Sequence, residues 1–456
     1  MNHKRHELIG GPKEAVADEG LSREITKWEL VALFVNVTVG AGIFRLPSDV
    51  ARAVGSYSLA AFIVCAVIVG LIVLCFAEVG SRFSGTGGPY LYARETFGPL
   101  VGFAVGWLMW LTRLAGFAAL TQVLVAYLGY FWPAVESGLT RVGVIAGVVV
   151  FLTVINIIGV RESARVGNVF TVSKLIPLVL FVLVGMFFVS PARLTLGPRP
   201  PVGLFSNAVF ILIYAFSGFE AVLVNSGEIR QPQRIIPVAM LSALSAVVVL
   251  FVLIQLVCVG TLPQLTTSER PLVDASQGFL GALGPAIISA GALIGILGTL
   301  NAVMLALTRL PFAMAVQGQL PALLARVHRR FRTPHVSILV SAAGVLLLAL
   351  AGTFIYAVKI TVITRVIVYS STCLALPILR RRCKMIAGER MPRNLPTAFE
   401  LPAGMLISIV CVVLCLWLLA NSGLREVRDV AIAVAIGLAF YGATKVAQRR
   451  VPISLT

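Results

Sequence analysis

The chain has 456 residues, of which 58% are hydrophobic and only 12% are charged, and its mean hydropathy is +0.96. Apolar runs of about 18 residues or more, long enough to cross a bilayer as helices, recur along the whole chain. These values exclude a soluble globular protein, and the continuous runs argue against a β-barrel, whose strands alternate between polar and apolar residues.

The net charge of +18 would suit a nucleic-acid-binding protein, but its distribution favours another interpretation. With the N-terminus in the cytoplasm, most Lys and Arg residues fall on cytoplasmic segments, as the positive-inside rule requires. The basic tract 380–384 follows the tenth apolar span and is interpreted as a topology anchor at anionic lipid. We therefore expect a multi-pass protein of the plasma or inner membrane, with both termini cytoplasmic and no nucleic-acid partner.

The first residues form a tail (1–26) that contains several acidic side chains and lacks the apolar core of a signal peptide, so we expect no cleavage there. Twelve transmembrane helices are predicted after it. Their approximate bounds are 28–54, 56–80, 100–128, 142–159, 168–189, 205–228, 235–260, 280–312, 336–353, 355–378, 401–420 and 427–445.

The first span contains the stretch Val39–Phe44, in which Gly40 and Gly42 lie in adjacent turns. A helix broken at the middle of a membrane exposes backbone groups that lipid cannot satisfy, so such a break indicates a binding site. The sixth span has a second candidate break at Tyr214–Glu220, where Ser217 and Gly218 interrupt an apolar run. The alternative is that these glycines only let helices pack closely.

The two breaks lie five spans apart, and an odd number of spans reverses the direction in which the second set crosses the membrane. We therefore predict an inverted repeat of five plus five helices. The expected units are a first repeat (27–190), a second repeat (200–380), two added helices (398–446) and a C-terminal tail (447–456). The first break then offers amide donors and the second offers carbonyl acceptors, which together suit a zwitterion.

Several motifs, in this order and spacing, resemble the amino acid–polyamine–organocation transporters over roughly residues 25 to 385. The resemblance implies an all-α polytopic membrane protein with about 12 transmembrane helices, a LeuT-like 5+5 inverted repeat, and a central amino acid site with alternating access. The motifs are Val39–Phe44 with Pro47, Ala77–Phe83, Gly87–Tyr90, Gly98–Pro99, Gly106–Trp107, Phe216–Glu220, Gly227–Ile229 with Pro232, Gln233 and Pro237, and Arg309 with Pro311–Gly318. Residues 90–97 are expected to form an amphipathic linker that lies against the membrane.

The same resemblance implies the residues of the substrate site. The substrate carboxylate would meet backbone N–H groups near Ala41, Gly42 and Ile43, and Gly40 is counted among the substrate-binding residues. Its ammonium group would meet carbonyl groups near Val39, Ala215 and Ser217. Tyr214 falls where the family often has an aromatic gate, and Phe216 is the rival for that role.

Two ionisable residues within the spans are candidates for proton coupling. Lys174 in the fifth span either binds and releases a proton, as the resemblance implies, or extends its stem to the interface. Glu220 either titrates during transport, pairs with Arg113, or supports the unwound backbone. Arg45 and Lys359 are expected to reach the outer vestibule, and Arg365 to reach a cavity or an acidic partner.

The seven cysteines and four histidines show no spacing typical of a disulfide frame or a metal site, so no cofactor is expected. The preferred function is secondary active transport of a neutral amino acid, driven by protons, with membrane lipid as the surroundings and the oligomeric state open. An exchanger, an amine or polyamine transporter and a non-transporting sensor are the alternatives. An enzyme is not expected, because the chain has no Ser/His/Asp or metal constellation and no phosphate-binding loop.

Overall fold

The computed structural model describes residues 25–83, 87–159, 164–390 and 399–450. Its first half begins with two short α-helices in place of one long one, and its second half begins with a short α-helix followed by a 3-10 helix. The helices of the first half are α1 (Lys27–Thr38), α2 (Ala41–Val54), α3 (Ser58–Ser81), α4 (Pro89–Phe97), α5 (Pro99–Leu128), α6 (Gly138–Ile158) and α7 (Ala164–Gly185).

The second half starts with α8 and continues through a 3-10 helix, η5, that follows it directly. It also contains a helix, α10, that the sequence analysis did not predict. The elements are α8 (Val202–Phe216), η5 (Phe219–Glu228), α9 (Pro232–Thr261), α10 (Pro271–Leu280), α11 (Leu283–Val316), α12 (His335–Ala351), α13 (Phe354–Arg390), α14 (Gly404–Ala420) and α15 (Leu424–Arg450).

The helices support the prediction of an all-α membrane protein. Seven helical segments of the described chain are long and apolar enough to cross a membrane, and four more apolar helices of 10 to 17 residues accompany them. Each of the twelve predicted spans overlaps one of the helices named above. The predicted linker 90–97 is also helical, as α4.

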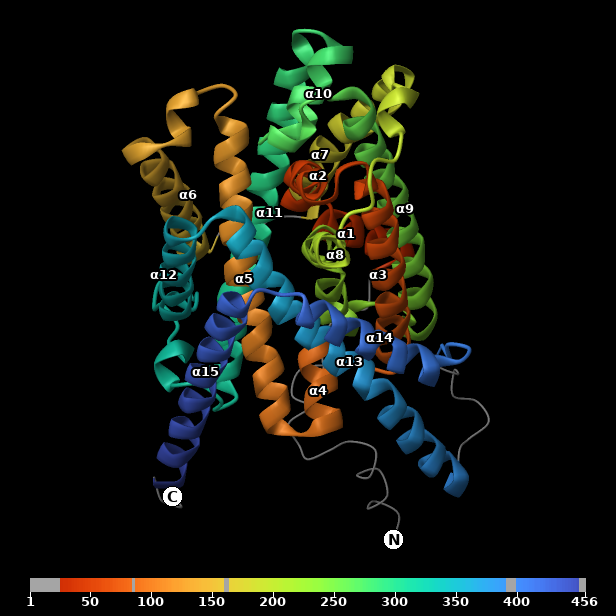
Figure 1. Ribbon diagram of the computed structural model, residues 1–456. Coiled ribbons are helices and arrows are strands. Elements are labelled where there is room, and N and C mark those ends of the chain that lie inside the picture. The colour runs from red at the N-terminus through yellow and green to blue at the C-terminus, as the bar shows by residue number, and fades with distance from the viewer. Residues whose placement is uncertain (1–24, 84–86, 160–163, 391–398, 451–456) are drawn as a thin grey trace.

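The short helices α1, α2 and α8 lie at the centre of the molecule and longer helices surround them (Figure 1). Among the closest pairs are α13 with α5, α3 with α9, and α11 with α5. Figure 1 shows α4 at one end of the molecule and α10 at the other, and we call these ends the α4 face and the α10 face. Large apolar side chains on the periphery, such as Phe151 (63% exposed) on α6, are those that lipid would cover.

The basic tract that follows the tenth span is bound to the protein itself. Arg380 donates two hydrogen bonds, of 2.7 and 2.6 Å, to Glu78 at the end of α3, and Glu78 also accepts one from the backbone N–H of Leu401. Arg382 donates to the carbonyl oxygens of Glu95 and Thr96 on α4. The interpretation of the tract as a lipid anchor is therefore corrected for these two arginines, which hold α3, α4 and α13 together.

Candidate functional site

The first helix break occurs at Val39 and Gly40, within the predicted stretch. Helix α1 ends at Thr38, and the N–H of Gly40 donates to the carbonyl of Thr38 at 2.9 Å instead of to the carbonyl one full turn back, that of Asn36. The Asn36 carbonyl is thereby released from the helix. Helix α2 begins at Ala41, and its first amides have no acceptor one turn back in their own helix.

The second break occurs at Ser217 and Gly218. Helix α8 ends at Phe216, Ser217 is extended, and Gly218 has φ = +114°, a backbone conformation that residues with a Cβ atom rarely adopt. The chain then continues as the 3-10 helix η5. The last carbonyl groups of α8 therefore face the same region as the first amides of α2.

The two breaks are packed against each other, and glycine is needed at two contacts. A Cβ atom on Gly42 would lie 2.6 Å from the Cα atom of Ala215, and a Cβ atom on Gly218 would lie 2.8 Å from the carbonyl oxygen of Val37. A Cβ atom on Gly40 would meet nothing within 4 Å. Gly42 and Gly218 thus allow the close approach of the two breaks, whereas Gly40 does not take part in it.

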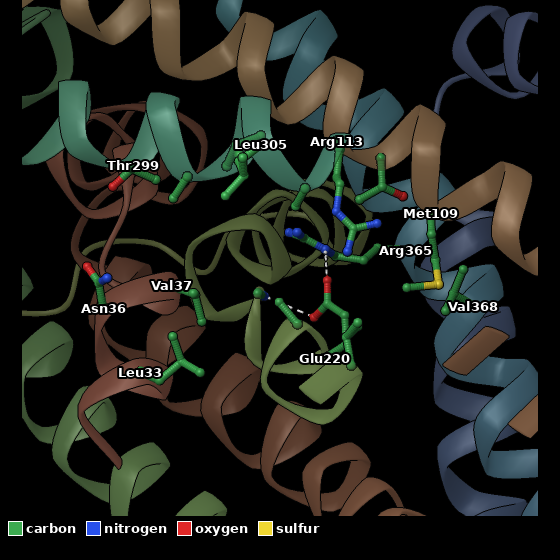
Figure 2. Close-up of a pocket in the computed structure, with 17 residues that line it drawn as sticks. Leu33, Asn36, Val37, Met109, Arg113, Glu220, Thr299, Leu305, Arg365 and Val368 are labelled. Carbon is green, nitrogen blue, oxygen red and sulfur yellow. Dashed lines mark hydrogen bonds and ion pairs between the residues drawn. The ribbon is translucent and has the colours of Figure 1, made fainter. Parts of the chain in front are cut away.

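A buried ion pair supports the second break (Figure 2). Glu220 accepts a hydrogen bond from Arg365 Nε on α13 at 2.8 Å, from the hydroxyl of Tyr369 at 2.9 Å, and from the N–H of Gly218 at 3.0 Å. Arg365 also donates to the hydroxyl of Ser217. Of the alternatives considered for Glu220, the structure contains the support of the unwound backbone. Its ion pair is with Arg365, and the described residues contain no ion pair between Glu220 and Arg113.

Lys174 on α7 reaches the first break. Its side chain is 1% exposed, and its Nζ atom donates to the released carbonyl of Asn36 at 2.6 Å and lies 3.4 Å from the hydroxyl of Thr299 on α11. Its stem lies against Gly295, where a Cβ atom would be 2.5 Å from that of Lys174. The side chain thus points into the protein and links α7 to both α1 and α11.

Two cavities adjoin the breaks. The larger has a volume of about 380 Å³ and extends along the α4-face halves of α1 and α11, where Leu33 and Ala306 line it. The smaller, of about 80 Å³, lies over the breaks themselves. Six residues line both cavities, so the two adjoin: Val37, Thr112, Arg113, Thr299, Val303 and Arg365.

The predicted substrate residues divide into two groups around the smaller cavity. Five of them line it, namely Gly40, Ala41, Gly42, Tyr214 and Ser217. The other four are buried outside its lining, namely Val39, Ile43, Ala215 and Phe216.

The placement of the aromatic side chains separates the two gate candidates. The ring of Phe216 packs against those of Phe62 and Phe251, behind the cavity. Tyr214 lines the cavity and its ring contacts that of Phe354 in edge-to-face geometry. Tyr214 is therefore the aromatic residue of the pair that faces the site.

Helices α5 and α11 contribute a polar lining that was not predicted from the sequence. Thr112 and Arg113 come from the interior of α5 and Thr299 from α11, each far from a glycine break. Arg113 was considered only as a partner for Glu220. A charged residue in the middle of an apolar span was the available signal for it.

On the α10 face, hydrogen bonds between α2 and the loop before α10 cover the site. Ser48 donates to the carbonyl of Ser268 at 2.5 Å, and Arg52 donates to that of Thr266 at 2.8 Å. Arg45 contacts the carboxylate of Glu269 at 3.3 Å, and its hydrogen bond holds the pKa of that carboxyl below its ordinary value. Arg45, expected to extend into a vestibule, is thus part of this closure.

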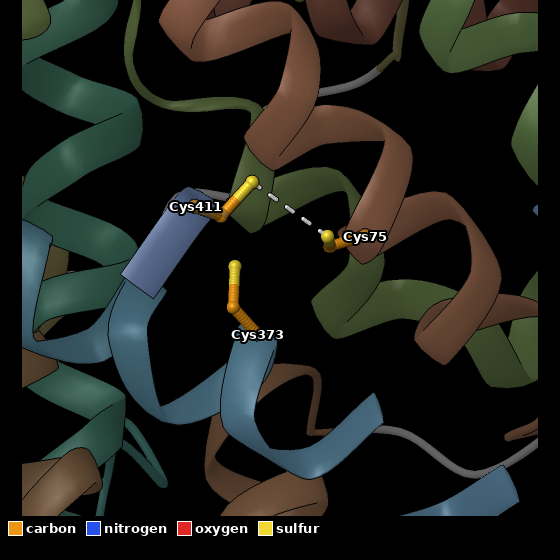
Figure 3. A group of neighbouring side chains, drawn as sticks. All are labelled: Cys75, Cys373 and Cys411. Carbon is orange, nitrogen blue, oxygen red and sulfur yellow. Dashed lines mark hydrogen bonds between the residues drawn. The ribbon is translucent and has the colours of Figure 1, made fainter. Parts of the chain in front are cut away.

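The cysteines include one group that could hold a metal ion. The sulfur atoms of Cys75, Cys373 and Cys411 lie within 4.8 Å of one another, and all three residues are buried between α3, α13 and α14 (Figure 3). None of the three lines either cavity. The six cysteines whose burial the structure describes are all buried, and the clustering of three of them was not predicted from the sequence.

Comparisons with known proteins agree with this architecture. A family model described as amino acid permease matches residues 25–441. Among curated proteins of Bacillus subtilis, the methylthioribose transporter is 29% identical over 93% of this chain and 93% of its own length. The serine/threonine exchanger SteT is 29% identical over 94% of this chain and 98% of its own length. The branched-chain amino acid permease BcaP is 27% identical over 93% of this chain and 93% of its own length. The chain therefore belongs to the amino acid permease family and is an integral membrane transporter, not an enzyme.

Proposed function

We propose that this transporter binds an amino acid between its two helix breaks and carries it across the membrane by alternating access. The supporting observation is that the first amides of α2 and the last carbonyls of α8 meet at one small cavity. Amides at a helix N-terminus favour a carboxylate, and carbonyls at a helix C-terminus favour an ammonium group. A free α-amino acid carries both groups on one carbon atom.

The two faces support the alternating part of this proposal. The larger cavity joins the site on the α4 side, while the bonds of Arg45, Ser48 and Arg52 cover it on the α10 side. Release of α2 from the loop before α10 would open a route from the site to the α10 face. Movement of α1 and η5 toward each other would close the route to the α4 face. We assign the α4 face to the cytoplasm of the cell on the positive-inside rule, which puts both termini there.

We further propose that proton binding at Lys174 couples to transport. A protonated amine binds the Asn36 carbonyl strongly, because a cation favours the C-terminal end of a helix and the bond is charge-assisted. A neutral amine binds it more weakly. Loss of the proton would therefore loosen α1 from α7 and α11 and shift the population toward a state in which α1 has moved.

Exchange of one amino acid for another is the second candidate, because one relative is named a serine/threonine exchanger. The relatives' names also include a methylthioribose transporter, so membership of the family does not by itself fix the substrate. An exchanger would use the same site. It would differ in requiring substrate on both sides for the site to reorient.

The test is uptake of a labelled amino acid panel into sodium-free proteoliposomes, with and without an inward proton gradient and with and without unlabelled amino acid inside. Proton-coupled transport predicts accumulation that requires the gradient and no internal amino acid. Uptake that requires internal amino acid and ignores the gradient would favour exchange. Absence of uptake and of binding for the whole panel would contradict an amino acid as the substrate and favour an amine or a sensor.

A further inference from the structure

The arginine of α5 is the charged group of the site whose role is unexplained. Arg113 lines both cavities, and its charged neighbours are Glu220 and Arg365. Within the part of the chain that the structure describes, its guanidinium group makes no hydrogen bond and no ion pair, whereas Arg365 is bonded to Glu220 and Ser217. Figure 2 shows Arg113 pointing into the region between α5, α11 and the second break.

The charges that line the cavities do not cancel. Two arginines and one glutamate face them, so one positive charge is in excess, and Lys174 lies just behind the lining at Asn36. An unpaired cation at this depth in a membrane protein is costly, and such groups usually face a cavity and find a partner there. A bound anion is the partner that this cavity can supply.

The location of Arg113 indicates which anion fits. The smaller cavity is lined by Ala41 and Gly42 of the first turn of α2 and, from α5, by Arg113. One molecule in this cavity and the adjoining larger one can therefore present a carboxylate to the α2 amides and a second anionic group to Arg113. A guanidinium group binds a carboxylate through two parallel hydrogen bonds, which adds specificity as well as affinity.

We propose that the substrate is an acidic amino acid, whose side-chain carboxylate binds Arg113 while its α-carboxylate and ammonium group occupy the two breaks. This inference rests on the proposed function and replaces the neutral substrate favoured by the sequence. The preference for a neutral substrate rested on the sequence near the breaks, where Glu220 is the carboxylate that could pair with a cationic side chain. It did not consider that a cation from α5 enters the same cavity.

The amide analogues of acidic amino acids provide the sharpest test. Glutamine and asparagine have nearly the same shape as glutamate and aspartate but carry no side-chain charge. We would measure uptake of all four and of leucine by the wild type, by Arg113→Gln, by Arg113→Lys and by Arg309→Gln in proteoliposomes. Arg309 is a matched control, since it is an arginine of α11 that lines neither cavity and, among the described residues, bonds only within its own helix.

The expected result is that the wild type prefers an acidic amino acid over its amide by roughly 10-fold or more, the range typical of a desolvated charge pair. Arg113→Gln should remove this preference while amide uptake persists, Arg113→Lys should restore part of it, and Arg309→Gln should keep it. Amide uptake by Arg113→Gln shows that the variant is folded. Thermal stability of each purified variant provides a second check.

Three results would overturn the inference. The first is a wild type that prefers an amide or leucine, and the second is an acidic preference that Arg113→Gln leaves unchanged. The third is uptake of neutral amino acids that depends on chloride, which would make an inorganic ion the partner of Arg113. In all three the protein still transports amino acids, so the proposed function stands. Failure to transport any of the five would overturn this inference, and the proposed function would fall with it only if no member of the wider amino acid panel were transported or bound.

Discussion

The two helix breaks are alike in position and unlike in the way they are held. At the first, the released carbonyl of Asn36 is bound by Lys174, whose charge depends on a proton. At the second, the unwound backbone is bound by Glu220, which is paired with an arginine that stays protonated under all ordinary conditions. One break is therefore held by a bond that loss of a proton would weaken, and the other by a bond that persists.

This difference indicates a division of roles between the two breaks. Under the proposed proton coupling, the first break would respond to protons, because its support comes from an amine on α7, a helix outside the broken pair. The second break provides a stable framework because Glu220 connects η5 to α13 through Arg365 and Tyr369. Each of the following substitutions alters one side of this comparison.

Glu220→Gln should have the largest effect. It leaves Arg365 without its ion pair, and loss of one partner of a buried pair costs about 3–5 kcal/mol of stability. We expect transport to be lost and the melting temperature of the purified protein to fall. Glu426→Gln is the control, since it breaks the Lys359 pair on α13 and α15 away from the cavities. Equal effects of the two substitutions on transport would contradict a special role for Glu220.

Gly42→Ala and Gly40→Ala test whether the two glycines of the first break have different roles. The methyl group at position 42 would collide with Ala215, so the two breaks would have to move apart and transport should be nearly abolished. At position 40 the methyl group has open space and φ is −120°, so uptake should fall by no more than about 5-fold, or about 1 kcal/mol. Comparable uptake by the two variants would show that the breaks are not packed as described.

Lys174→Met should affect energy coupling more than substrate binding. The substitution keeps an apolar stem against Gly295 and removes the bond to Asn36, so accumulation driven by a proton gradient should fall by roughly 10-fold or more. Substrate affinity, measured by displacement of a labelled amino acid, should change little. A variant that still accumulates substrate in response to the gradient would eliminate Lys174 as the coupling group.

Tyr214→Phe should have the smallest effect. The hydroxyl group lies 3.5 Å from the carbonyl of Gly116, which is a weak contact, while the ring lines the cavity. Loss of such a bond corresponds to about 0.5–1 kcal/mol, so the apparent affinity should change by no more than about 5-fold. Tyr214→Ala, which removes the ring, should change it more. If the two variants were equally impaired, the hydroxyl and not the ring would be the functional part.

The breaks were predictable from the sequence because each has a local signature, a pair of small residues inside an apolar run. The apolar runs likewise predicted the helices, although the short helix α10 was missed because it lies in a polar connection. Lys174 could be singled out because an ionisable residue within a span is rare.

Contacts between distant segments could not be predicted in this way. The pairing of Glu220 with Arg365 joins residues 145 positions apart and depends on how η5 packs against α13. The entry of Arg113 into the cavity depends on the rotation of α5, which hydropathy alone does not define because this helix is buried on most sides. The orientation of Phe216 away from the cavity could not be predicted either, because it depends on the residue at which α8 ends.

The most direct test of the central claim, that substrate is held between the two breaks, is a structure of the protein in a lipid nanodisc with its best-transported amino acid bound. We predict density for the substrate in the smaller cavity, with its α-carboxylate at a hydrogen-bond distance of about 3 Å from the amides of Ala41 or Gly42. Substrate density confined to the α4-face part of the larger cavity, near Leu33 and Ala306, with the breaks unoccupied, would contradict it.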